Sequence, residues 1–159
     1  MHPRAQELID ELKLEPHPEG GFYREIHRSP LQVQPQDTRG VRAAMTTIYF
    51  LLPAPAFSRW HAVASDEIWH LYEGGPLELR VCDPQVNATE VIRLDRASAA
   101  TGPVAIVPAN HWQAARPLGE YALVGATVGP GFEFGDFSFL SAHHALASRL
   151  HDPLDCSLL

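Results

Sequence analysis

The 159-residue sequence has no run of basic residues, and its formal net charge is −7, with 12 Lys and Arg against 19 Asp and Glu. This absence argues against nucleic acids and anionic membrane surfaces as partners, because both select for clustered positive charge. Long apolar runs are also missing. The strongest one, TTIYFLLPAPAF at residues 46–57, is interrupted by two prolines and is too short to span a bilayer. We therefore expect a soluble protein of the cytoplasm.

The chain has only two cysteines, Cys82 and Cys156, and their separation fits neither a metal motif nor a redox pair. We expect two free thiols in a reducing compartment. No internal repeat or low-complexity segment divides the chain, and its length suits one domain with its own buried core. The sequence therefore predicts a single domain over residues 1–159.

The hydrophobic pattern changes once along the chain. Apolar residues first recur with helical spacing, which predicts a short amphipathic helix at about residues 4–14. From about residue 20 to about residue 140, short β-branched and aromatic runs alternate with Pro and Gly, which is typical of strands in a sandwich or barrel. A short C-terminal helix is expected at about residues 141–152, ahead of Pro153. The predicted fold class is all-β, with residues 30–40 as a long polar loop.

The segment FSRWHAVASDEIWHLYEGGP at residues 57–76 gathers two imidazoles and a carboxylate. Strand alternation allows His61 and Glu67 to share one interior, and it puts His70 on the opposite face of its strand from Glu67. Such a group suits a metal site, an acid/base pair or a hydrogen-bonded structural pair. The spacing alone leaves these three interpretations open.

Two motifs in this region resemble those of the cupin superfamily. The first is H-x-V-x3-E-x6-G at residues 61–74, in which Val63 stands where a second histidine is usual. The second is G-x5-P-x-N-x2-Q at residues 102–113, in which Asn110 replaces a glycine and Gln113 replaces a metal-binding histidine. The skeleton of both motifs is present, and half of the usual ligands are not.

Longer segments make the resemblance more specific. They are PHPEGGFYREIHRS at 16–29, SDEIWHLYEGGPLEL at 65–79, VPANHWQAA at 107–115 and GPGFEFGDF at 129–137. Together they resemble one cupin family, largely uncharacterised and often labelled predicted sugar epimerase. The resemblance implies a double-stranded β-helix (jelly-roll barrel) with a small-molecule pocket in its mouth, and usually a homodimer.

The resemblance also raises the question of a divalent transition metal. Cupin metal sites usually combine three histidines with a glutamate. The corresponding side chains here are His61, Glu67 and Gln113. A neutral amide oxygen is a poor donor and Val63 donates nothing, so no metal and no other cofactor is favoured. If a metal binds, these three side chains are its predicted ligands.

Acid/base chemistry without a metal is the leading interpretation. His61 suits a general base that Glu67 orients, because imidazole titrates near neutral pH. This arrangement is similar to that of metal-independent cupin-like epimerases of keto-sugar nucleotides, in which a tyrosine across the pocket is the acid. Tyr23, Tyr49 and Tyr72 are candidates, and Tyr23 is preferred because it lies in the PEGGFYRE segment. The predicted catalytic residues are therefore His61, Glu67 and Tyr23.

Aromatic and polar residues near the motifs are typical of a ligand pocket. The predicted pocket residues are Arg59, Trp69, Phe57, Tyr49, Asn110, His111 and Gln113. Whether His70 and Trp112 face the pocket or a partner subunit is left open.

The sequence thus predicts a small-molecule-binding cupin, with metal-independent epimerisation or isomerisation of a sugar derivative or similar polar metabolite as the leading function. One alternative is a metal-dependent cupin enzyme of the dioxygenase or isomerase type. The other is a non-catalytic ligand-binding or storage module.

Overall fold

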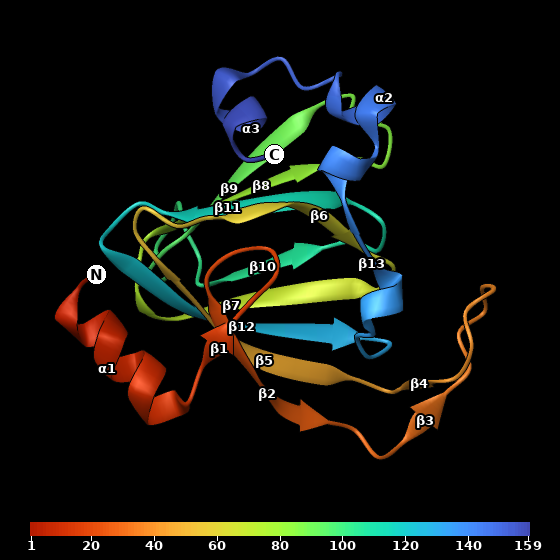
Figure 1. Cartoon of the computed structure of the whole chain (residues 1–159), viewed down its shortest axis with the longest axis horizontal. Coiled ribbons are helices and arrows are strands. Elements are labelled where there is room, and N and C mark those ends of the chain that lie inside the picture. The colour runs from red at the N-terminus through yellow and green to blue at the C-terminus, as the bar shows by residue number, and fades with distance from the viewer.

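The structure, a computed structural model, describes residues 1–159 and consists of two antiparallel sheets packed face to face (Figure 1). The six-stranded sheet has the order β1 (Glu15–Pro16), β2 (Phe22–Arg28), β5 (Thr46–Pro53), β12 (Tyr121–Gly129), β7 (Asp66–Gly74) and β10 (Val104–Val107). The five-stranded sheet has the order β13 (Phe137–Phe139), β6 (Ser58–Val63), β11 (Trp112–Pro117), β8 (Leu77–Cys82) and β9 (Thr89–Leu94).

From β5 onward the chain passes from one sheet to the other at almost every connection. This path winds the strands around a common interior and makes the protein a jelly-roll barrel. The predicted all-β class is therefore confirmed. No helix is both long enough and apolar enough to cross a membrane.

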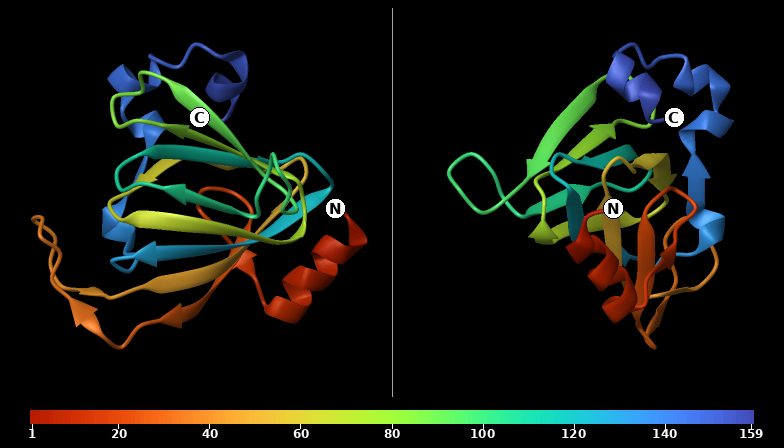
Figure 2. Two further views of the ribbon diagram at one scale, coloured as in Figure 1. Left: turned by 180° about the vertical axis from the view of Figure 1, so that it is seen from behind. Right: turned by 60° about the vertical axis from the view of Figure 1, so that its left-hand side comes forward.

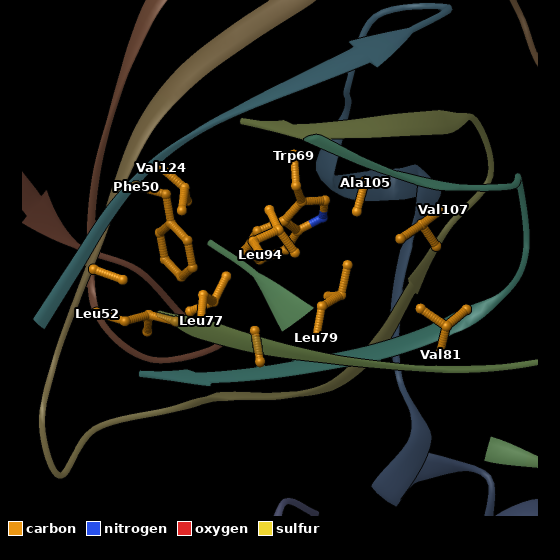
Figure 3. Packing of buried hydrophobic residues seen from close by; sticks show 12 residues of the cluster. Phe50, Leu52, Trp69, Leu77, Leu79, Val81, Leu94, Ala105, Val107 and Val124 are labelled. Carbon is orange, nitrogen blue, oxygen red and sulfur yellow. The ribbon is translucent and has the colours of Figure 1, made fainter. Parts of the chain in front are cut away.

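A hydrophobic cluster fills the space between the sheets (Figure 3). Phe50 and Trp69 of the six-stranded sheet point toward Leu77, Leu79 and Val81 of the five-stranded sheet. Strand alternation explains this core, since every second residue of β7 and β8 faces inward.

The outer faces of both sheets are partly covered by the ends of the chain (Figure 2). Helix α1 (Pro3–Leu12) packs Leu8 against Leu51 and Leu123 on the outside of the six-stranded sheet. It ends two residues earlier than predicted, because Lys13 takes a left-handed conformation with φ of 53°.

The C-terminal segment is helical, but it is not the single helix predicted at 141–152. The chain instead forms a 3₁₀ turn at Leu140–Ala142, α2 (His144–Ala147) and α3 (Pro153–Ser157). Helix α3 begins late because the Asp152 side chain accepts from two backbone N–H groups of its first turn, with Pro153 directly after it. This segment covers the five-stranded sheet, where the buried Asp155 accepts from Arg80 Nε at 2.5 Å.

The predicted polar loop at 30–40 includes β3 (Gln32–Val33), which pairs with β4 (Arg42–Ala43) in a short hairpin that extends away from the barrel (Figure 1). At the base of this hairpin, Arg42 Nε and Nη2 each donate to a carboxylate oxygen of Asp136 at 2.8 Å. Both cysteines are free, with Cys82 buried and Cys156 exposed. The expectation of unpaired thiols is confirmed for both.

Candidate functional site

A cavity of about 130 Å³ opens at one end of the barrel interior. Its walls come from β2, β5, β6, β7 and β12, and from two loops that precede β2 and follow β12. A cavity of roughly 150 Å³ accommodates benzene, so this one fits a ligand of similar size.

The loop before β2 aims Glu19 into this cavity. Gly20 has φ of 120° and Gly21 has φ of 68°, both in the region that favours glycine. A Cβ atom on Gly20 would lie 2.1 Å from the carbonyl oxygen of Phe57, so only glycine lets this loop approach β6. The carbonyl oxygen of Glu19 accepts from the backbone N–H of Arg59 at 2.9 Å. The Gly-Gly pair thus places a buried carboxyl group against β6.

The Glu19 carboxyl group contacts two side chains of β6. Ser58 Oγ donates to Glu19 Oε1 at 2.8 Å, and Glu19 Oε2 lies 3.2 Å from His61 Nε2. Glu19 Oε2 also lies 3.7 Å from His17 Nδ1. The side chains of all four residues are at least nine-tenths buried, and no Lys or Arg side chain lies within ion-pair distance of Glu19.

The hydrogen-bond partners assign the tautomers of both imidazoles. His61 Nδ1 lies 2.8 Å from the carbonyl oxygen of Arg59, which only accepts, so Nδ1 carries the proton and Nε2 of the neutral ring has a free lone pair. His17 Nδ1 accepts from the backbone N–H of Glu19 at 3.2 Å. A carboxylate at Glu19 would face both of these lone pairs. A proton on Glu19 Oε2 resolves the contacts by donating to His61 Nε2.

The pKa directions agree with this neutral pair. Burial raises the pKa of Glu19, although nearby His17, the hydrogen bond from Ser58 and the charge of Arg59 act in the opposite direction. Burial lowers the pKa of His61, although the charge of Glu67 and the contact with the Arg59 carbonyl raise it. Both shifts favour a protonated carboxyl group beside a neutral imidazole.

Glu67 is the second buried carboxyl group of the cavity, and an oriented amide holds it. Trp69 Nε1 only donates, and it donates to Gln113 Oε1 at 2.9 Å. The amide nitrogen of Gln113 therefore points at Glu67 Oε2, to which it donates at 2.5 Å. The other oxygen of Glu67 has no hydrogen-bond partner within the protein.

Burial raises the pKa of Glu67 to about 7. The charge of His61 and the hydrogen bond from Gln113 lower this pKa, and the neighbouring Glu19 raises it. A carboxyl group with this pKa exchanges its proton readily at neutral pH, which suits general acid/base catalysis.

A comparison with known protein families matches residues 6–140 to the Cupin superfamily (DUF985). The chain belongs to this family. Among solved structures, this cupin is similar to a hypothetical protein from Leishmania major, with 30% identity, 97% of each chain covered and a TM-score of 0.86. A protein from Shewanella oneidensis is also 30% identical, with 97% of this chain and 94% of that chain covered and a TM-score of 0.81.

More remote similarity extends to oxalate decarboxylase from Bacillus subtilis. Its identity to this cupin is 16% and its TM-score is 0.58, with 89% of this chain and 32% of that chain covered. At this identity the likeness concerns the fold alone. No curated protein matches the chain.

The donor set of this cupin does not fit a transition metal. Gln113 presents its amide nitrogen, not its oxygen, to Glu67, because the indole of Trp69 holds the oxygen. Val63 lines the cavity without any donor atom. No group of three or more His, Cys, Asp or Glu side chains is arranged to hold a metal ion. We therefore derive no chemical step through a metal.

The structure brings four predicted site residues to the cavity wall, namely His61, Glu67, Tyr23 and Trp69. Gln113 lies directly behind Glu67 and orients it. His70 does not line the cavity and stacks with Tyr72 of the same strand, as alternation predicts.

Besides Gln113, five predicted pocket residues do not line the cavity, and Tyr49 and Arg59 are two of them. Tyr49 lies on the outside of β5, where it packs with the cluster under α1, because its neighbours Ile48 and Phe50 face inward. Arg59 lies at the barrel edge, 4.3 Å above the ring of Phe139, and donates to the carbonyl oxygen of Pro18. A register shift between β6 and β11 breaks the alternation before His61, so that Ser58, not Arg59, reaches Glu19.

Phe57, Asn110 and His111 are the other three. Phe57 packs with the cluster beneath the C-terminal segment. Asn110 lies in a turn with φ of 64°, and its backbone N–H donates to Val63. His111 follows that turn, and its Nδ1 lies 3.3 Å from the carbonyl oxygen of Ala109. The undecided Trp112 packs against the C-terminal segment.

Several cavity residues were missed by sequence reasoning. They are His17, Glu19, Glu25, Arg28, Phe132, Glu133 and Phe134. All of them lie in the segments PHPEGGFYREIHRS and GPGFEFGDF, which carried the family resemblance. The available signal was the Glu-Gly-Gly sequence, in which a carboxylate directly precedes an unusual bend.

Proposed function

We propose that the cavity of this cupin binds a small polar metabolite and moves a proton between carbon and oxygen on it, an isomerase-type reaction that uses no metal. One observation carries the proposal. Glu67, a buried carboxyl group with a pKa near 7 and one free oxygen, shares the cavity with the neutral Glu19–His61 pair. Enolisation requires a general base that is ionised near neutral pH and, beside it, a general acid that carries a proton.

In the proposed step, the Glu67 carboxylate removes a proton from the carbon next to a carbonyl group. The electrons of that C–H bond form the carbon–carbon double bond of an enol, and the carbonyl oxygen takes the proton of the Glu19–His61 pair. Returning a proton to the other carbon or to the opposite face completes isomerisation or epimerisation. The Tyr23 hydroxyl, which has no hydrogen-bond partner in the protein, supplies a further donor to the substrate.

This assignment moves the role of base from His61 to Glu67. The lone pair of His61 Nε2 lies against Glu19, whereas the free oxygen of Glu67 belongs to a residue of the cavity wall. His61 then acts as the partner that holds the shared proton.

The charges of the wall support a small metabolite over a nucleotide sugar. A diphosphate needs converging cations, and Arg28 is the only Lys or Arg that lines the cavity. Arg28 is already paired with Glu25 and Glu133, each at 2.9 Å. Arg59 and Arg116 are engaged elsewhere, with Pro18 and Glu78. Small size also agrees with the cavity volume of about 130 Å³.

The test is hydrogen–deuterium exchange on two carbonyl probes of suitable size, hydroxyacetone and aminoacetone. NMR follows deuterium entering next to the carbonyl group in D₂O, with protein that has been dialysed against EDTA. The wild type is expected to accelerate exchange on at least one probe. Glu67→Gln should reduce the acceleration at least about 100-fold, the scale of general acid/base catalysis.

Two control variants replace a Glu and a His outside the cavity, and they test whether the effect is specific to the site residues. Glu90 is exposed on β9 without a side-chain partner, and His144 is exposed on α2. Glu90→Gln and His144→Gln should accelerate exchange on the probes as the wild type does, whereas His61→Gln should accelerate it less. Binding of both probes without any acceleration would contradict the enzymatic proposal and favour a non-catalytic binding module. The homodimer implied by the family resemblance stays a prediction, which light scattering checks.

A further inference from the structure

We infer that the substrate of this cavity is a small organic cation, a primary ammonium compound that lacks carboxylate and phosphate groups. The inference rests on the proposed function, because it names the substrate class of the same site. It stands on three features of the cavity: a carboxyl oxygen of Glu67 without a hydrogen-bond partner in the protein, a wall without a free Lys or Arg side chain, and several aromatic side chains.

Glu67 supplies the unpartnered oxygen. The residue is 7% exposed and lines the cavity, and its one protein hydrogen bond comes from the uncharged amide of Gln113. No Lys or Arg nitrogen lies within 4.0 Å of it. Desolvating an anion without a counter-charge is expensive, so this carboxyl group ionises most favourably when a cation enters beside it.

The charged side chains at the rim of the cavity also favour a cationic ligand over an anionic one. Glu25 and Glu133 flank the single cation Arg28, so these three side chains together carry one net negative charge. A carboxylate or phosphate ligand would have to displace one of the two glutamates from Arg28. An ammonium ligand meets no such competition and is attracted by the net charge.

Aromatic faces complete the site. Tyr23, Phe50, Trp69, Phe132 and Phe134 all line the cavity. Aromatic rings attract cations through their negative faces, and the attraction strengthens where water is excluded. Aromatic side chains beside the Glu67 carboxylate therefore favour an ammonium group with a short carbon skeleton over an anion of the same size.

Binding of a cation is linked to deprotonation of Glu67. The charged groups that act on its pKa are His61 on β6 and Glu19 on the loop before β2. The other titratable groups of the cavity wall are His17 on that loop, Glu25 and Arg28 on β2, and Glu133 after β12; Val128 on β12 adds no charge. Since the pKa of Glu67 is about 7, an ammonium ligand should bind about tenfold more weakly at pH 6 than at pH 8. An uncharged ligand has no such dependence.

The experiment is calorimetric titration with three probes of matched shape, isobutylammonium, isobutanol and isobutyrate. At pH 8 we expect isobutylammonium to bind at least tenfold more tightly than isobutanol, and isobutyrate not to bind. Repeating the titration in two buffers of different ionisation enthalpy counts the protons released, and this number should approach one per ligand at pH 6. Glu67→Gln should abolish both the preference and the proton release, and Glu90→Gln should preserve them.

The inference is overturned if isobutanol binds as tightly as isobutylammonium, if isobutylammonium does not bind, or if its binding releases no protons in the wild type. The last readout needs no variant. Failure of this inference is separable from failure of the proposed function. Exchange on hydroxyacetone without a preference for the ammonium probe would support the isomerase proposal and contradict the ammonium inference. Preferential binding of the ammonium probe without exchange on either carbonyl probe would support the ammonium ligand class and contradict the isomerase proposal.

Discussion

Glu67→Gln should stabilise the protein at alkaline pH. One pKa unit corresponds to about 1.4 kcal/mol, so a pKa raised from 4.5 to about 7 corresponds to about 3 kcal/mol. Below pH 4.5 the carboxyl group is protonated in both the folded and the unfolded chain, and it contributes nothing to pH dependence. Between pH 4.5 and pH 7 the unfolded chain ionises while the folded protein keeps its proton, so the wild type loses stability as the pH rises. Above pH 7 this loss is complete.

Glutamine keeps the carbonyl oxygen that accepts from Gln113 and cannot ionise. Urea unfolding of the wild type and Glu67→Gln at half-unit steps from pH 4.5 to pH 8.5 should therefore give free-energy curves that coincide at low pH and separate by about 3 kcal/mol at pH 8. Glu90→Gln, which changes an exposed carboxylate, should follow the wild type throughout. A difference between the wild type and Glu67→Gln that does not vary with pH would refute the reasoning about the pKa of Glu67.

Further substitutions test the supports of the site. Trp69→Phe removes the donor to Gln113 Oε1 and should lower the free energy of unfolding by about 2–4 kcal/mol in urea titrations; a loss below 1 kcal/mol would argue against the oriented amide. Gly20→Ala puts a Cβ atom 2.1 Å from the Phe57 carbonyl oxygen at φ of 120° and should cost at least about 2 kcal/mol, whereas Gly102→Ala, with no atom within 4 Å of its Cβ, should be nearly neutral by the same measurement. Arg80→Ala breaks a buried pair with Asp155 and should cost about 3–5 kcal/mol, against less than about 1 kcal/mol for Arg93→Ala, whose pair with Asp95 is more exposed; equal losses would mean that burial does not govern these pairs.

Local rules predicted an all-β sandwich or barrel and the proximity of two site residues, and the family resemblance implied the jelly-roll barrel. Strand alternation over β6 and β7 is enough to turn His61 and Glu67 toward one interior. It is also enough to turn His70 away. Local rules failed where a contact between distant segments decides the geometry.

Glu19 is the clearest example of such a contact. Its position depends on how closely Gly20 approaches the Phe57 carbonyl oxygen, and on Ser58 and His61 about 40 residues later in the chain. The register shift in β6 that sends Arg59 to the barrel edge has no signature in the letters of that strand. The interrupted C-terminal helix likewise depends on the Asp152 cap and on burial of Asp155 against Arg80.

The central claim is that Glu67 transfers a proton in this cavity without a metal. The most direct measurement is the rate of deuterium exchange on hydroxyacetone and aminoacetone by EDTA-treated wild-type protein between pH 5.5 and pH 8.5. After subtraction of the protein-free rate, we expect exchange on at least one probe to rise about tenfold from pH 6 to pH 8 and to level off above a midpoint near 7, the pKa of the Glu67 carboxyl group. Exchange that is absent after EDTA treatment and returns with added metal, or that shows no midpoint near 7, would contradict the claim.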